Sequence, residues 1–141
     1  QKMNLDNNLI TFENCVEDDG RLILNEDEFE LLRATIKNRE ITKKAIELMK
    51  QKEFDHREFG QLLFKHHEVL SKMLMTSTSK IDEMVRASID AGAFGAKING
   101  SGGGGCMFAY APENHKEVAE AIKSLGGTAY IIHADHGTRK V

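Results

Sequence analysis

The strongest chemical signal in the sequence is a run of glycines at residues 100–105, in which only Ser101 is not glycine. Glycine inside regular structure costs about 0.5–1 kcal/mol relative to alanine, so a folded domain keeps such a run where the backbone needs positive φ or a ligand comes close. Successive amides of a glycine turn can hold phosphate oxygens without a cationic side chain, and the hydroxyl of Ser101 adds a donor. The candidate phosphate loop consists of Gly100, Ser101, Gly102, Gly103, Gly104 and Gly105.

A flexible hairpin or linker is the alternative interpretation of the same run. The run contains no proline and no charged residue, and apolar segments flank it at residues 96–99 and 106–110, which argues against a linker. It is not a Walker loop, because no Gly-Lys-Ser/Thr follows, and it lacks the spacing and the following helix of a dinucleotide fingerprint. On the residues alone, an anion site and a simple connector both remain open.

Other polar residues give weaker signals. Ser77 and Thr78 lie between two predicted helices, so they either cap the second of these helices or lie near a substrate, and both roles stay open. His66 and His67 are neighbours on a helix and therefore point about 100° apart, a poor arrangement for chelating one metal ion. No metal site is predicted.

The residues near the carboxyl end and the two cysteines are also expected to be inert. His133, Asp135 and His136 have no fourth ligand within reach by spacing, and a surface role is expected for them. Cys15 and Cys106 show the spacing of neither a disulfide framework nor a zinc site. Both are expected to be reduced thiols, with Cys106 packed in a strand.

Helices are predicted from capping residues and apolar periodicity. Asn25 with Glu28 resembles a capping box, and the helix that it opens is expected to reach about residue 51. Asp55 with Glu58 repeats the pattern, and a third helix is expected from a cap at Ser79 to the neighbourhood of Gly92. The inner face of the second helix is predicted to consist of Phe59, Leu62, Leu63, His66, Leu70 and Met73.

Strands are expected at both ends of the sequence and on either side of the glycine run. A strand pair with a turn at Asp18, Asp19 and Gly20 is predicted over residues 9–24, and a last strand over residues 128–133. A fourth helix is expected after Pro112, and the pair Gly126 and Gly127 should end it. Short antiparallel strands with helices on one face indicate an α+β fold, a sandwich of ferredoxin-like type.

The composition bounds the class of protein. A chain of 141 residues with 40% apolar and 29% charged residues fits one domain, over residues 1–141, with a real core. The net charge of -3 suggests neither nucleic acid nor an anionic membrane as the main partner. The apolar runs are too short for a membrane span, and a cytoplasmic location is expected. The start at Gln1 suggests a domain excised from a longer protein.

The stretch GAKINGSGGGGC resembles the glycine-rich third motif of the GHMP kinases, which faces the phosphates in the active site of that family. The segments LLFKHHEVL and SKMLMTSTSKID are similar to galactokinase sequences, and they place His67, Ser77, Thr78 and Asp82 on the family pattern. RATIKNREIT and AYIIHADHGTR extend the resemblance, which covers roughly residues 27 to 141. It implies the C-terminal domain of a small-molecule kinase.

Departures from the pattern bear on the substrate. Galactokinases usually carry Phe where this chain has Gly103, and an all-glycine loop is commoner in mevalonate kinases. Phe64 and His66 stand where galactokinases usually carry Asn and Ser. In a gap-free register, however, the mevalonate kinase pattern falls one residue out of step before the Ser-Thr pair. The helix segments therefore favour galactose or a close hexose over mevalonate.

The resemblance also implies what lies outside the sequence. In the family, the catalytic Asp, the sugar contacts and a nucleotide-phosphate loop belong to an N-terminal domain, which would bind most of the ATP and Mg²⁺. This chain would then hold no catalytic residue, would pair with its own N-terminal domain and would be inactive alone. The resemblance implies for the whole enzyme the transfer of the γ-phosphoryl group of ATP to galactose. The competing hypothesis from another class is a ferredoxin-like module that binds a small anion without catalysis.

Overall fold

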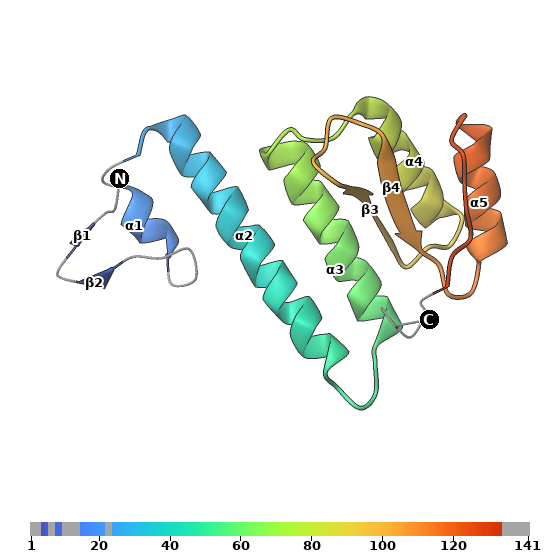
Figure 1. Cartoon of the computed structure of the whole chain (residues 1–141), viewed down its shortest axis with the longest axis horizontal. Coiled ribbons are helices and arrows are strands. Elements are labelled where there is room, and N and C mark those ends of the chain that lie inside the picture. Colours follow the sequence, from blue (N-terminus) through green and yellow to red (C-terminus); the bar gives the residue numbers. More distant parts are fainter. Residues whose placement is uncertain (1–3, 6–7, 10–14, 22–23, 134–141) are drawn as a thin grey trace, which may run out of the picture.

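Two long antiparallel helices are followed along the chain by a shorter helix, a β-hairpin and a last short helix (Figure 1). The structure is a computed structural model, and it describes residues 4–5, 8–9, 15–21 and 24–133. The helices are α1 (Glu17–Arg21), α2 (Glu26–Met49), α3 (His56–Glu68), the π-helical turn η1 (Val69–Met73), α4 (Ser79–Asp90) and α5 (His115–Ser124). The strands are β1 (Asn4–Leu5), β2 (Asn8–Leu9), β3 (Gly95–Asn99) and β4 (Cys106–Tyr110).

The starts of the helices follow from local capping. Asn25 and Glu28 form a complete capping box at α2, since each side chain accepts a hydrogen bond from the backbone amide of the other. The carboxylate of Asp55 accepts hydrogen bonds from the amides of Arg57 and Glu58 at the start of α3. Both predicted caps are confirmed, and they fix where the two long helices begin.

The helix α3 continues into η1, where the hydrogen-bond pattern widens. The amide of Leu74 donates to the carbonyl of Val69, five residues earlier, at 3.0 Å. The amide and the hydroxyl of Thr76 then both donate to the carbonyl of Leu70, each at 2.9 Å. The exposed Met75 between them has a left-handed backbone, with φ of 51°. These contacts turn the chain toward α4.

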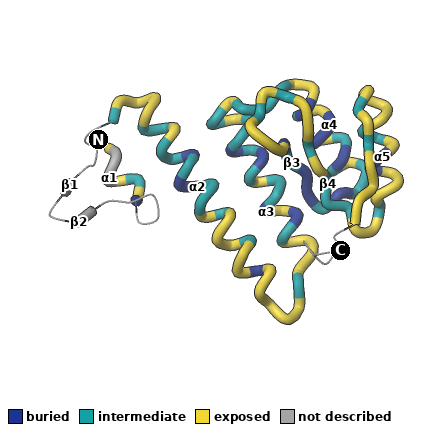
Figure 2. The backbone as a smooth tube through the Cα atoms, in the orientation of Figure 1, coloured by how far each residue is buried: buried dark blue, intermediate teal, exposed yellow. Residues whose placement is uncertain are grey.

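The strands β3 and β4 form an antiparallel hairpin with Ile98 opposite Met107. The inner face of this hairpin packs on α3 and α4 through a cluster of apolar side chains, and Figure 2 shows buried residues where these elements meet. The outer face carries the exposed residues Cys106 and Phe108. The cluster consists of Ile81, Val85, Ala96 and Ile98, with Phe64, Leu70, Met107 and Ala109 packed against it.

The α+β class expected from the sequence is confirmed, with helices packed on one face of the antiparallel hairpin. Among the described residues, the sheets are two-stranded: β3 with β4, and the short pair of β1 with β2. None of the helices in the described part of the chain is both long and apolar enough to cross a membrane.

Several local predictions were wrong. The predicted turn at Asp18, Asp19 and Gly20 belongs to α1, because the acidic segment forms a short helix that packs on α2. Residues 10–14 and 22–23 of the predicted strand pair lie outside the described residues. Residues 128–133 form no strand, and they take no part in the ladder between β3 and β4.

Two further corrections concern helix detail. The N-cap of α4 is Thr78 and not Ser79, because the Thr78 hydroxyl accepts the hydrogen bond from the amide of Ile81 at 3.3 Å. His67, and not His66, lies on the buried face of α3, with 4% of its surface exposed. The three-and-four spacing gives an approximate face only, and the packing of α3 against β3 decides which of two neighbours points inward.

Candidate functional site: the glycine connection between two strands

The glycine run forms the connection between β3 and β4, as predicted, and its backbone is left-handed almost throughout. The φ angles of its glycines are all positive: Gly100 at 83°, Gly102 at 88°, Gly103 at 77°, Gly104 at 116° and Gly105 at 89°. A residue with a side chain rarely adopts this conformation. The glycines are therefore required by the path of the backbone itself.

One side of the connection rests on the segment before α4. The amide of Gly103 donates to the carbonyl oxygen of Thr76 at 2.7 Å. A Cβ atom at Gly102 would lie 2.5 Å from the same oxygen, so Gly102 permits the close approach. A Cβ atom at Gly104 would lie 3.7 Å from the methyl group of Thr78. The structure thus brings the predicted supports, Ser77 and Thr78, into the same region as the loop.

The other side of the connection is open. A Cβ atom built on Gly100, Gly103 or Gly105 would meet nothing within 4 Å among the described residues. Ser101 is exposed. The connection is therefore held from beneath and left accessible above, which is the arrangement that a backbone site for an anion needs.

Ser77 and Thr78 have different surroundings. Thr78 caps α4, which is the structural role that the sequence left open for it. Ser77 Oγ is buried and makes no hydrogen bond of standard geometry, although it lies near enough to Asp82 to help lower the pKa of that carboxyl group. Ser77 therefore belongs to a polar cluster under the loop.

This cluster also contains His67, which sequence reasoning missed as a site residue. Its Nδ1 accepts a hydrogen bond from the amide of Ile98 at 3.3 Å, and its Nε2 lies 3.1 Å from Oδ1 of Asp82. The hydroxyl of Ser71 donates to Oδ2 of Asp82 at 2.8 Å. The spacing of His67 and Asp82 in the sequence matches a family pattern, but the contact of His67 with β3 could not be found from the sequence.

Lys97 is a second residue that sequence reasoning did not single out. Its ammonium donates to the carbonyl of Ile98 at 2.9 Å and lies 5.4 Å from the centre of the Phe108 ring. Burial lowers the pKa of Lys97. Burial also lowers the pKa of His66, and the charge of Lys97 lowers it further. The strand that enters the loop therefore carries a half-buried positive charge.

The remaining candidates lie elsewhere. Cys106 is a free thiol in β4, but it is exposed, whereas the sequence suggested that it would be packed. Cys15 is buried. The side chain of His133 is exposed, and Asp135 and His136 lie outside the described residues. Across the described ranges, no group of His, Cys, Asp and Glu side chains is arranged to hold a metal ion.

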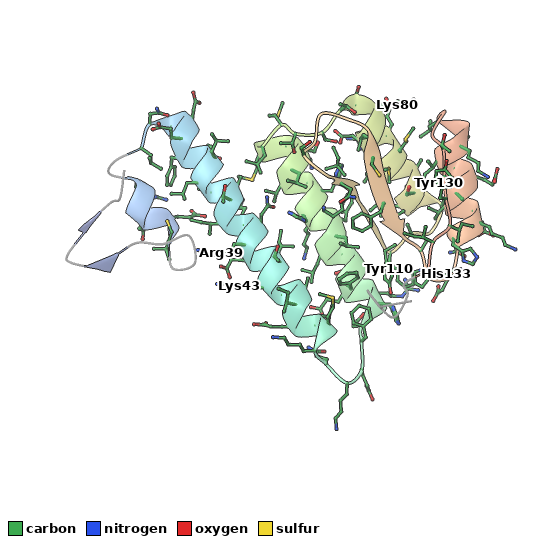
Figure 3. All side chains as sticks on the ribbon, in the orientation of Figure 1. Arg39, Lys43, Lys80, Tyr110, Tyr130 and His133 are labelled. Carbon is green, nitrogen blue, oxygen red and sulfur yellow. The ribbon has the colours of Figure 1, made fainter. Side chains whose placement is uncertain are left out.

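Figure 3 places the labelled side chains relative to the loop. Arg39 and Lys43 lie on α2, whereas Lys80 lies at the start of α4. Tyr110 lies at the end of β4 remote from the glycine connection. A cavity of about 550 Å³ lies between α2 and α3, and none of its lining residues belongs to the loop. The cavity and the glycine loop are therefore separate features of the surface.

Comparison with known proteins identifies the family of this chain. Residues 44–128 match the family described as GHMP kinases C terminal, a match that covers more than half of the chain. The chain belongs to this family, whose members are kinases. The glycine connection is inside the matched range.

Individual relatives are mevalonate kinases and galactokinases. The chain is 49% identical to the mevalonate kinase of Thermococcus onnurineus over 83 residues, which is 58% of this chain and 25% of the relative. It is 34% identical to the galactokinase of Mycobacterium bovis over 71 residues, which is 50% of this chain and 20% of the relative. The chain thus spans about a quarter or less of these relatives.

A solved structure shares the fold. The galactokinase of Lactococcus lactis in complex with galactose superposes with a TM-score of 0.68 and 21% identity, over 84% of this chain and 33% of that one. At this identity the likeness concerns the fold.

Proposed function

We propose that this chain is the C-terminal domain of an ATP-dependent small-molecule kinase, and that residues 100–105 bind the phosphate side of ATP. The observation that carries the proposal is the left-handed glycine connection, pinned to Thr76 on one side and open on the other. Membership of the GHMP kinase family supports the reaction class, and the loop supplies a site at which backbone amides meet the transferred group.

The contribution of the loop is electrostatic. Phosphoryl transfer depends on positioning and on stabilising charge that develops on the phosphate oxygens. Amides fixed in advance by the backbone can do this without the cost of reorganisation during the reaction. The domain needs no nucleophile or base of its own for this role, and the base would come from the N-terminal part of the longer enzyme. ATP with Mg²⁺ would supply the phosphoryl group.

Mevalonate is the first candidate for the acceptor. The mevalonate kinase of Thermococcus onnurineus is 49% identical, against 34% for the galactokinase of Mycobacterium bovis over a similar length. The all-glycine form of the loop favours the same substrate. Galactose is the second candidate, supported by the galactokinase relative and by the resemblance of the helices around His67 and Asp82.

The test is a coupled ADP-release assay on the full-length protein with mevalonate and galactose as separate acceptors. Turnover that requires both ATP and an acceptor, and that falls when Gly104 is replaced by valine, is expected. ATP-independent anion binding without turnover by the full-length protein would instead support a non-catalytic anion-binding module.

A further inference from the structure

A line of hydrogen bonds and close contacts runs beneath the glycine loop from one of its anchors to the other. It begins at β3, where the amide of Ile98 donates to Nδ1 of His67 at 3.3 Å. Because Nδ1 accepts this bond, the proton of the neutral imidazole is on Nε2. That nitrogen lies 3.1 Å from Oδ1 of Asp82, on α4. One buried ring thus joins the strand that enters the loop to the helix beneath it.

The line continues through the other oxygen of Asp82. The hydroxyl of Ser71, in η1, donates to Oδ2 at 2.8 Å. The neighbouring residue, Leu70, accepts both the amide and the hydroxyl of Thr76, and the carbonyl of Thr76 accepts the amide of Gly103. Ile98 is therefore bonded directly to the imidazole of His67. Thr76 is connected to the carboxylate of Asp82 through Leu70 and its neighbour Ser71.

We infer that His67 and Asp82 are positioning residues for the glycine loop, a role that rests on the proposed function of that loop. His67 holds the backbone of β3 two residues before Gly100. Asp82 orients the ring and fixes η1, which in turn holds Thr76 under Gly103. Neither side chain touches the phosphate. Both set where the amides of the loop point, and a displacement of about 1 Å at such a site can cost on the order of a hundredfold in rate.

The charge states of the pair agree with this arrangement. Burial lowers the pKa of His67, Asp82 raises it in part, and Lys97 on β3 lowers it further, so the ring is neutral at pH 7. Glu68, on the same helix as His67, favours the charged form, and its effect is the smallest. Burial alone would raise the pKa of Asp82, but the hydroxyls of Ser77 and Ser71 and the ring of His67 outweigh burial, and the pKa is lowered.

Two substitutions at His67 separate its two contacts. His67→Asn keeps an acceptor near the position of Nδ1 and removes the Nε2 nitrogen that lies 3.1 Å from Asp82. His67→Gln can extend its amide toward Asp82 and leaves the amide of Ile98 without its acceptor. Asp82→Asn preserves shape and removes the negative charge, and it serves where a His67 variant does not fold. His115→Gln is the matched control, because His115 is exposed in α5.

Two measurements are made on these variants. Amide hydrogen exchange in the 141-residue chain reports on Ile98 and Gly103, and steady-state kinetics of the full-length kinase give kcat and KM for ATP. We expect His67→Gln and Asp82→Asn to speed exchange at Gly103 and to lower kcat by about tenfold or more, with a much smaller change in KM. His67→Asn should keep the amide of Ile98 protected from exchange, unlike His67→Gln. His115→Gln should match the wild type in both exchange and kcat.

Exchange at Gly103 and kcat that stay within about twofold of wild type in both His67→Gln and Asp82→Asn would overturn the inference. An equal rise in exchange at the amides of α5 would overturn it as well, because it would mark a general loss of stability. Absence of turnover in the wild-type full-length protein would overturn the proposed function alone, since the exchange measurement does not depend on catalysis.

Discussion

Gly60 in α3 and Gly95 in β3 lie in direct backbone contact. A Cβ atom at Gly95 would collide with the carbonyl group of Gly60 and would lie 2.8 Å from its Cα atom. A Cβ atom at Gly60 would collide in turn with the backbone of Phe94. This approach lets α3 lie on β3 closely enough for His67, two turns further along, to reach the amide of Ile98.

Gly95→Ala should therefore destabilise the domain by about 3 kcal/mol or more, because the added methyl group has only backbone to displace. Urea unfolding followed by circular dichroism measures the loss. Gln61→Ala, a control at an exposed position of α3, should alter the free energy of unfolding by no more than about 0.5 kcal/mol. Equal stability of the Gly95→Ala variant and the wild type would contradict the close contact.

Substitutions in the glycine loop should affect turnover more than stability. Gly104→Val forces a β-branched residue into a backbone with φ of 116°, at a site where its Cβ has room. Gly102→Val adds a collision with the carbonyl of Thr76. In the full-length enzyme both should reduce kcat on the order of tenfold to a hundredfold. Lys50→Ala, at the exposed end of α2, is the control, and wild-type kcat in Gly104→Val would make the loop a mere connector.

The domain should lose stability as the pH falls below about 6.5. Burial lowers the pKa of His66 and of His67 below their ordinary value of 6.5, so the unfolded chain takes up protons that the folded domain resists. The pKa of Asp82 is lowered from 3.8, and its contribution is lost at still lower pH. Urea midpoints at pH 7 and pH 5 test the sign. His67→Asn should weaken the dependence of the urea midpoint on pH. A wild-type midpoint that is higher at pH 5 than at pH 7 would refute the predicted loss of stability.

The choice of acceptor is open to a direct comparison. The full-length enzyme should phosphorylate mevalonate with a higher kcat/KM than galactose, as the identities to the relatives favour. A coupled ADP-release assay with each acceptor gives both constants. A higher kcat/KM for galactose than for mevalonate would instead identify the acceptor as the hexose that the helix segments suggested.

The 141-residue chain alone should not phosphorylate either acceptor. It spans about a quarter of its mevalonate kinase relative, and the proposed division of labour leaves the catalytic base outside it. Release of ADP by the purified chain is compared with a control that lacks the chain. Acceptor-dependent release above that control would show that the active site is complete without a further domain.

Local rules explain why part of the fold could be predicted and part could not. The caps at Asn25 and Asp55 depend on residues three positions apart. The glycine run by its composition predicts a backbone with positive φ angles. Both features can therefore be predicted from the sequence. The helix α1 depends on its packing against α2, which local turn signals do not reveal, and the β-branched and aromatic residues at 128–133 form no strand in the described part of the chain. The role of His67 depends on the meeting of α3 and β3, a contact across 31 residues of sequence.

The π-helical turn Val69–Met73 changes how the spacing between His67 and Ser77 should be compared among relatives. Its hydrogen bond from Leu74 to Val69 spans five residues, so the turn holds one residue more than an α-helical turn does. A relative with one residue fewer can close an ordinary α-helical turn at this point and still deliver its serine and threonine to the start of α4. An offset of a single position between galactokinase and mevalonate kinase patterns can therefore be absorbed by the helix geometry, and by itself it does not distinguish the two substrates.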